Sequence, residues 1–363
     1  MTAPAIDRRG LFLFWEGNGQ RGLFCGEERK DFMIGQRVEI WREDEYAYPA
    51  AWGFIPVMVT YLHEDTDVHP AMLVVPGGAY RYVSPSEGDV VARRFYEKNY
   101  NVFVLAYTVN YFDEPLRMQP LNDISRAVRI IRTHAEKLHI DPKKLAVCGF
   151  SAGGHLCASL CVHYKDISDP RPEFAGVSNR PDAAVLSYPV ITSGEYANRE
   201  SFLALLGKDA SEEDLEYMSL EKQVTEDTPP CFLWQTATDR SVPVENSCLF
   251  AEALRKCGVP YAHHIFSDGV HGMSVASEEW LEGKYRDTYT LEQIKKLAAA
   301  VREGKTDYPP EKADEILREF GLDGNRPDKW TPEEKERLRG ILPEVGVWPE
   351  LAEKWLEREW AGQ

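Results

Sequence analysis

The chain has 363 residues, of which 43 % are hydrophobic and 28 % charged, and its formal net charge at pH 7 is −17. Its length and composition suit a globular protein with one large α/β domain and an appendage, or with two small domains. The negative charge repels nucleic-acid phosphates and anionic lipids, which argues against nucleic-acid and membrane partners without identifying a substrate.

The start of the sequence does not match a targeting signal. Its apolar run at residues 11–15 is shorter than the apolar stretch of a secretory signal, and no window reaches the roughly 18 apolar residues of a membrane span. The seven cysteines form no C-x-x-C pair and lie mostly in apolar patterns. We therefore expect buried thiols and a cytoplasmic protein.

Strands and helices are predicted to alternate along the chain. Residues 37–41 and 54–62 alternate apolar and polar positions, which predicts an antiparallel start to a sheet. Unbroken apolar runs predict buried strands at 71–75, 102–107, 145–150, 183–188, 231–235 and 261–266.

Two stretches between these strands have helical spacing. A helix is predicted over 123–138, with Asn122 or Asp123 as its cap, and another over 245–257. Strands that alternate with helices imply right-handed crossovers. The sequence therefore predicts an α/β fold with a mostly parallel central sheet flanked by helices.

The C-terminal part is highly charged and predicts short helices at 291–301, 310–320 and 332–341, followed by a final helix at 348–356. The third has a Thr331-x-x-Glu334 capping box. We expect four parts along the chain: an N-terminal extension (1–50), an α/β core (51–280), a helical insertion near the active site (281–343) and a last core helix (344–363). We expect the apolar side chains of the insertion to be buried, either against the core or against a second subunit of a homo-oligomer.

A serine between glycines is the leading candidate for chemistry. Residues 149–155 read Gly-Phe-Ser-Ala-Gly-Gly-His, after a predicted strand and before a predicted helix. G-x-S-x-G in that context predicts a sharp turn that exposes Ser151. A plain Gly/Ser turn is the alternative. His155, four residues further along, is expected to have a structural role.

Polar residues just past the carboxyl ends of parallel strands form binding sites in open α/β sheets. Asp239 and His271 each follow a predicted core strand, so the chain order Ser, Asp, His is that of α/β-hydrolase triads. Asp268 is an alternative acid. His263 and His264 are alternative histidines, although both lie inside a predicted strand.

A glycine-rich segment, Pro-Gly-Gly-Ala-Tyr at 76–80, follows the strand at 71–75. Acyl transfer needs N–H groups aimed at the developing oxyanion. We expect one from Ala152 at a helix N-terminus and another from Gly78 or Ala79, although Gly-Gly after Pro is also a common tight turn. The sequence contains no H-x-x-H or H-E-x-x-H spacing, so no metal site is expected.

Together these motifs resemble the bacterial acetyl-xylan-esterase-like branch of the α/β-hydrolases, which is also similar to the hormone-sensitive-lipase-like esterases. The resemblance extends from about residue 55 to 275. The matching segments are 76–80, Glu87 with 91–92, Tyr107, 149–155, 188–191, 205–207, 236–247, 264–266 and 271–272. Ala79 stands where this family usually has a third glycine, and it still carries an N–H.

The resemblance implies a serine esterase that removes acetyl or similar short acyl groups, often from plant-polysaccharide fragments, and that needs no cofactor. Its substrate would be a small-molecule or oligosaccharide ester. His271 would take the proton of Ser151 while Asp239 orients the imidazole, and Tyr80 and Tyr188 would contact the substrate. A peptidase or amide hydrolase on the same fold, and a non-catalytic relative, are the alternatives.

Overall fold

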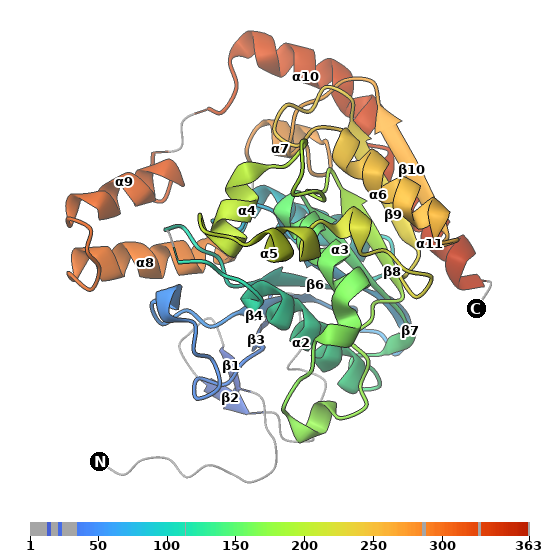
Figure 1. Cartoon of the computed structure of the whole chain (residues 1–363), viewed down its shortest axis with the longest axis horizontal. Coiled ribbons are helices and arrows are strands. Elements are labelled where there is room, and N and C mark those ends of the chain that lie inside the picture. The colour runs from blue at the N-terminus through green and yellow to red at the C-terminus, as the bar shows by residue number, and fades with distance from the viewer. Residues whose placement is uncertain are drawn as a thin grey trace.

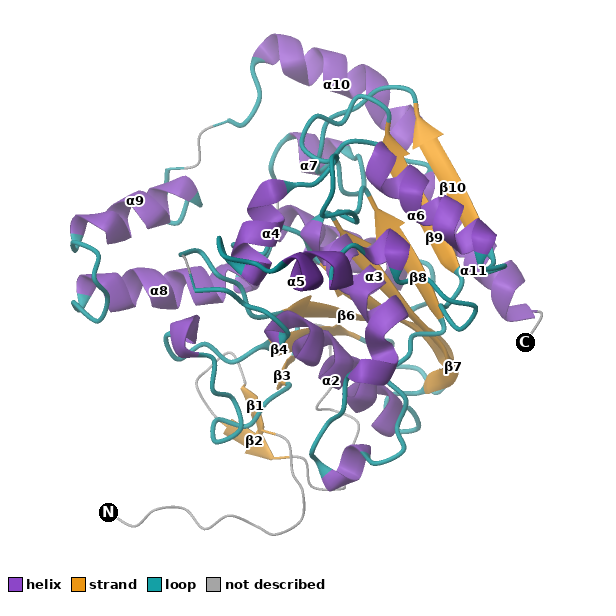
Figure 2. Cartoon of the chain, viewed as in Figure 1, coloured by secondary structure: helices purple, strands orange, loops and turns teal. Residues whose placement is uncertain are grey.

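A ten-stranded sheet runs through the computed structural model (Figures 1 and 2). The structure describes residues 13–15, 21–23, 35–112, 114–284, 288–325 and 328–361. The strand order is β10-β9-β8-β7-β5-β6-β4-β3-β1-β2. The strands are β1 (Leu13–Trp15), β2 (Arg21–Leu23), β3 (Arg37–Glu39), β4 (Val57–Tyr61), β5 (His69–Val75), β6 (Asn101–Ala106), β7 (Ile140–Phe150), β8 (Ala183–Ser187), β9 (Cys231–Thr236) and β10 (Tyr261–Phe266).

The pairing is parallel from β6 through β5, β7, β8 and β9 to β10, whereas β3 and β4 join the sheet antiparallel. The mostly parallel sheet and its antiparallel start are therefore confirmed. All residues of β6, β8 and β9 are buried. Such strands have apolar residues on both faces because helices cover both sides of the sheet.

Two hydrophobic cores lie on the two faces of the sheet. One contains Leu73 and Val147 with α2 (Gln119–Thr133), α3 (Ala152–His163) and α6 (Glu245–Lys256). The other contains Met72 and Ala146 with α1 (Asp89–Tyr96) and α11 (Trp348–Ala361). Two shorter helices, α4 (Arg199–Leu206) and α5 (Glu212–Tyr217), follow β8.

The start of α2 differs from the prediction of a cap at Asn122 or Asp123. The helix begins at Gln119, so Asp123 lies inside it, fully buried. The Asp123 carboxylate accepts hydrogen bonds from the Thr108 N–H (2.8 Å) and the Trp41 indole (2.7 Å). Burial raises the pKa of Asp123 to about 6. Besides a hydrogen bond from the Gln119 side chain at the start of its own helix, this aspartate binds partners that are distant in sequence, which local spacing does not reveal.

The predicted short helices of residues 281–343 are present as α8 (Glu292–Arg302), α9 (Glu311–Glu319) and α10 (Pro332–Val345), after the short α7 (Glu278–Leu281). The capping box at Thr331 is formed. The helices α8 and α9 bury Ile294, Leu297 and Ile316 in a separate small cluster, and side chains of the α/β body pack against it (Trp52, Tyr82, Tyr111 and Phe112). In contrast, α10 packs into the same core as α11. Figure 1 shows α9 and α10 well apart on the outside of the molecule.

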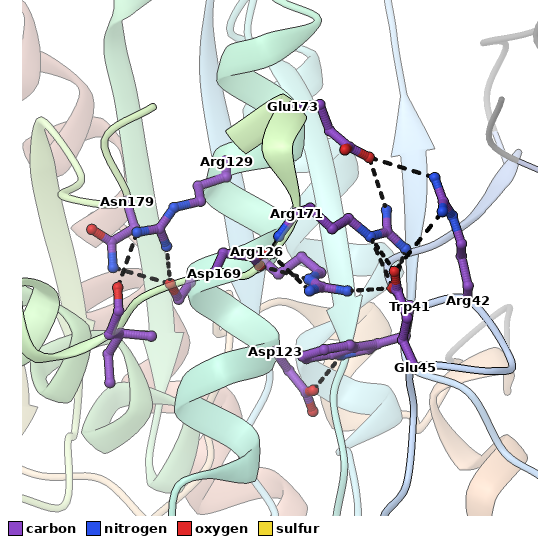
Figure 3. Close-up of polar contacts among 12 residues, drawn as sticks. Trp41, Arg42, Glu45, Asp123, Arg126, Arg129, Asp169, Arg171, Glu173 and Asn179 are labelled. Carbon is purple, nitrogen blue, oxygen red and sulfur yellow. Dashed lines mark hydrogen bonds and ion pairs between the residues drawn. The ribbon is translucent and has the colours of Figure 1, made fainter. Parts of the chain in front are cut away.

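A charge cluster holds the segment before β4 to the body (Figure 3). The Arg126 side chain, which is 0 % exposed, donates hydrogen bonds to Glu45 (2.9 Å) and Asp169 (2.7 Å). The Arg126 guanidinium also lies 3.6 Å from the centre of the Trp41 ring. Arg171 donates a second hydrogen bond to Glu45 (2.8 Å). These contacts join three segments that are distant in sequence.

We predict that Glu45→Gln lowers stability in a pH-dependent way. Burial raises the pKa of Glu45, but hydrogen bonds from Arg171 and Arg126 lower it to about 2. A carboxyl group whose pKa is lower in the folded state stabilises the fold above its unfolded pKa of about 4.3, and that contribution is lost as the pH falls towards the folded value. Denaturant unfolding should show a loss of about 1–3 kcal/mol at pH 7 and a smaller loss at pH 3.

The control for this experiment is Glu43→Gln, because Glu43 is exposed two residues away and surface substitutions change stability little. An equal loss at pH 7 and pH 3 in Glu45→Gln would contradict the electrostatic explanation.

Candidate active site

Ser151 lies at the turn between β7 and α3. Its backbone has φ 53° and ψ −119°, a conformation that non-glycine residues rarely adopt. Glycines on either side make the turn possible. A Cβ at Gly153 would collide with the Val75 carbonyl, and one at Gly149 would collide with the Gly153 carbonyl. The predicted sharp turn is therefore present, and Ser151 is 8 % exposed at its apex.

The structure brings Ser151, His271 and Asp239 together. His271 Nε2 lies 2.8 Å from Ser151 Oγ, and His271 Nδ1 lies 2.6 Å from Asp239 Oδ2. The other Asp239 oxygen accepts hydrogen bonds from the N–H groups of Ser241 and Val242. The Asp239 side chain is 1 % exposed and that of His271 21 %. A carboxylate fixed in this way orients an imidazole that can accept a serine proton.

The alternative acid and histidines have other partners. Asp268 accepts a hydrogen bond from the Thr238 hydroxyl and pairs with Arg337 at 2.8 Å. His263 Nε2 lies 3.0 Å from the Ser247 hydroxyl, and the His264 ring packs on Phe232. The geometry favours Asp239 and His271 over all three.

The predicted oxyanion donors lie on two segments next to Ser151. Ala152 is the first residue of α3, where backbone N–H groups have no partner within the helix. Gly78 (φ 121°) and Ala79 (φ 53°) form the turn after β5. A Cβ at Gly77, in the same turn, would reach 2.8 Å from the Ser151 Cβ. The two segments are therefore adjacent.

The structure corrects the expectation that Tyr80 and Tyr188 contact the substrate. Both side chains are buried, with 1 % exposure each. The Tyr80 hydroxyl lies 2.8 Å from Nδ1 of the buried His155, which has the structural role expected of it. The Tyr188 hydroxyl donates to Glu87 (2.7 Å) and accepts from the Ser274 N–H (3.0 Å). Both phenols are therefore buried and hydrogen-bonded within the protein.

Glu87 links the loops around the site, a role that spacing did not predict. One carboxylate oxygen accepts from the Gly77 N–H at 2.8 Å, and the other accepts from Tyr188. Since Tyr188 also holds Ser274, Glu87 connects the turn after β5 to the loop that carries His271. Burial raises the pKa of Glu87, while the Tyr188 and Gly77 hydrogen bonds oppose this effect. Only the resemblance of its segment pointed to this position.

We predict that Glu87→Gln destabilises the protein. The amide can accept one of the two hydrogen bonds, but its NH₂ group would face the other donor and leave a buried polar group unsatisfied. The free energy of unfolding should fall by about 1–3 kcal/mol, as measured with denaturant. Glu97→Gln, on an exposed side chain (68 %), is the control. Wild-type stability in Glu87→Gln would argue against this link.

Neither a metal site nor a membrane span is found in the part of the chain that the structure describes. No group of three or more His, Cys, Asp or Glu side chains is placed there to hold a metal ion. None of the described helices has the length and apolar character needed to cross a bilayer.

Comparison with known proteins identifies relatives of this chain. The model of the BD-FAE family matches residues 59–254. Endo-1,4-beta-xylanase B of Butyrivibrio fibrisolvens is 50 % identical over 266 residues, which are 73 % of this chain and 42 % of that protein. An acetylxylan esterase of Xylanibacter ruminicola is 29 % identical over 236 residues, which are 63 % of this chain and 45 % of that protein. The chain spans less than half the length of these two relatives.

A solved structure resembles the chain over most of its own length. The acetyl ester-xyloside bifunctional hydrolase of Caldicellulosiruptor lactoaceticus has 38 % sequence identity and a TM-score of 0.64, covering 69 % of this chain and 93 % of that one. With the strand order described above, this likeness confirms the α/β-hydrolase fold.

Proposed function

The chain belongs to the BD-FAE family, on the acetylxylan-esterase-like branch of the α/β-hydrolase esterases, and we propose that it is a serine carboxylesterase. The observation that carries the proposal is the 2.8 Å contact between Ser151 Oγ and His271 Nε2, with Asp239 on the other imidazole nitrogen. A hydroxyl, a base and an orienting carboxylate in this order suit acyl transfer.

The proposed mechanism has two halves. Ser151 Oγ attacks the ester carbonyl as His271 takes the hydroxyl proton, and Asp239 stabilises the resulting imidazolium. The N–H of Ala152 and that of Gly78 or Ala79 bind the oxyanion. The intermediate collapses to an acyl-enzyme, and His271 gives the proton to the departing alcohol. Water then attacks the acyl-enzyme with His271 as base, which releases the acid and restores Ser151.

We infer that the substrate is a short acyl ester, most simply an acetyl group, on a xylan-type oligosaccharide. The names of the relatives support this inference, since one is an acetylxylan esterase, one is a xylanase and the solved hydrolase is named for both acetyl ester and xyloside. That last name also makes xyloside hydrolysis a second candidate activity to be assayed.

The first test concerns the three residues. Ser151→Ala should remain folded and lower the esterase rate by roughly 10³-fold or more, because the hydroxyl is the nucleophile. Asp239→Asn should also lose most activity, whereas Asp268→Asn, whose carboxylate pairs with Arg337, should retain it. Initial rates on 4-nitrophenyl acetate measure all three. More than a tenth of the wild-type rate in Ser151→Ala would refute the assignment.

The second test concerns the substrate. Rates on 4-nitrophenyl esters from acetate to octanoate should fall with chain length, and acetylated xylo-oligosaccharides should release acetate. The 4-nitrophenyl xyloside reports the second candidate activity in the same assay. Rates that rise steadily towards octanoate, without acetate release from the oligosaccharides, would count against a carbohydrate acetylesterase.

A further inference from the structure

The turn after β5, residues 77–82, holds the proposed oxyanion donors in a strained backbone conformation. Gly78, Ala79 and Tyr80 all have positive φ, at 121°, 53° and 59°. Alanine and tyrosine adopt such angles only at a cost in free energy, so neighbouring groups must hold the turn in this form. Since the direction of an N–H group follows the backbone, the contacts that hold this turn also decide where the donors at Gly78 and Ala79 point.

Tyr82 closes this turn and lies directly against Gly78. The Gly78 carbonyl accepts hydrogen bonds from the N–H groups of Arg81 (2.9 Å) and Tyr82 (3.2 Å). A Cβ at Gly78 would lie 2.1 Å from the Tyr82 carbonyl oxygen and 3.2 Å from Cδ2 of the Tyr82 ring. A movement of Tyr82 would therefore be transmitted directly to Gly78.

The Phe320 ring, at the C-terminal end of α9, packs against the Tyr82 ring. The ring centres are 5.0 Å apart and the planes meet at 60°, an edge-to-face arrangement that stabilises a pair beyond the area it buries. Phe320 also contacts the Tyr111 ring, at 5.9 Å between centres. The Tyr111 carbonyl in turn accepts a 2.9 Å hydrogen bond from the Arg81 side chain. Phe320 thus contacts both Tyr82 and the residue that binds its neighbour Arg81.

The insertion fixes the position of Phe320. The Phe320 N–H donates to the Ile316 carbonyl (3.4 Å), and Ile316 is fully buried in the cluster that α9 shares with the adjacent α8 (Figure 1). The Tyr111 hydroxyl donates to the carboxylate of Glu319, the last residue of α9. Contact with a helix end held in this way restricts how far Tyr82 can move.

We propose that Phe320 is a positioning residue for the oxyanion site, through which the insertion keeps the turn after β5 in its catalytic form. Phe320 acts through Tyr82. Without the Phe320 ring, the strained turn relaxes for part of the time, and the N–H groups of Gly78 and Ala79 then no longer point at the oxyanion. This inference rests on the proposed function, because it concerns the hydrogen-bond donors of that reaction.

Kinetics on 4-nitrophenyl acetate test the proposal. Phe320→Ala should lower kcat and kcat/KM together by about 5- to 50-fold, less than the roughly 10²-fold or more that loss of a whole oxyanion donor costs. KM should change by less than about 2-fold, because the lost interaction is made in the transition state. Phe320→Tyr keeps the ring and should stay within about 2-fold of the wild-type rate. An unchanged kcat in Phe320→Ala, or a loss confined to KM, would overturn the proposal.

Two further measurements distinguish positioning from a general effect on stability. Inhibition by trifluoroacetone, whose adduct with Ser151 carries an oxyanion, should weaken in Phe320→Ala by a factor similar to the loss of kcat/KM. In a Tyr82→Leu background, Phe320→Ala should lower kcat/KM by less than about 2-fold, because Phe320 acts through Tyr82. Inhibition of wild-type strength, or losses that simply multiply in the double variant, would overturn the proposal.

Tyr308→Ala is the matched control. Tyr308 is an exposed aromatic residue (36 %) of the same insertion, and its ring stacks on Phe112 at 3.9 Å between centres rather than on the turn after β5. Tyr308→Ala should keep kcat/KM within about 2-fold of wild type. A loss as large as that of Phe320→Ala would overturn the specific role of Phe320.

Phe320→Leu guards against a variant that fails to fold. It keeps a large apolar side chain without the ring, and we expect a loss of kcat/KM of about 2- to 10-fold, between those of Phe320→Tyr and Phe320→Ala. Wild-type rates in both Phe320→Ala and Phe320→Leu, with Ser151→Ala inactive, would refute only the role of Phe320. A wild-type protein that hydrolyses none of the esters would refute the proposed function and this inference with it.

Discussion

The close approach of α3 to the ends of β5 and β7 is the constraint on which the site depends. A side chain at Gly153 would collide with the backbone of β5, and one at Gly149 would collide with the first turn of α3. With both glycines in place, the chain reverses within one residue at Ser151. The same approach brings the turn after β5 next to the serine, so that a hydroxyl and several backbone N–H groups share one small region.

Buried hydrogen bonds hold the loops of the site in place. Glu87 and Tyr188 join the turn after β5 to the His271 loop, and the Trp348 indole donates to the Ser274 carbonyl of that loop. Buried polar groups are costly unless they are satisfied, but when satisfied they favour a single arrangement. The positions of the turn after β5 and of the His271 loop therefore depend on buried side chains outside the Ser-His-Asp group.

The sequence predicted features that depend on neighbouring residues, but it did not predict contacts between side chains that are distant in the chain. Apolar runs predicted the core strands, and the glycines on either side of Ser151 predicted the turn. Asp123 looked like a helix cap, because its partner Trp41 is far away in the chain. Tyr80 and Tyr188 looked like substrate contacts because spacing does not show which way a side chain points.

The late position of α11 in the chain has a consequence for biosynthesis. Trp348 is fully buried and packs against Phe95, Phe150 and Trp234, directly beneath the strand that ends at Ser151. During translation these three aromatic side chains emerge from the ribosome long before Trp348 does. Until then they expose apolar surface, and such surface makes partly folded chains prone to aggregate. The apolar core on this face of the sheet is thus completed only after α11 has been synthesised.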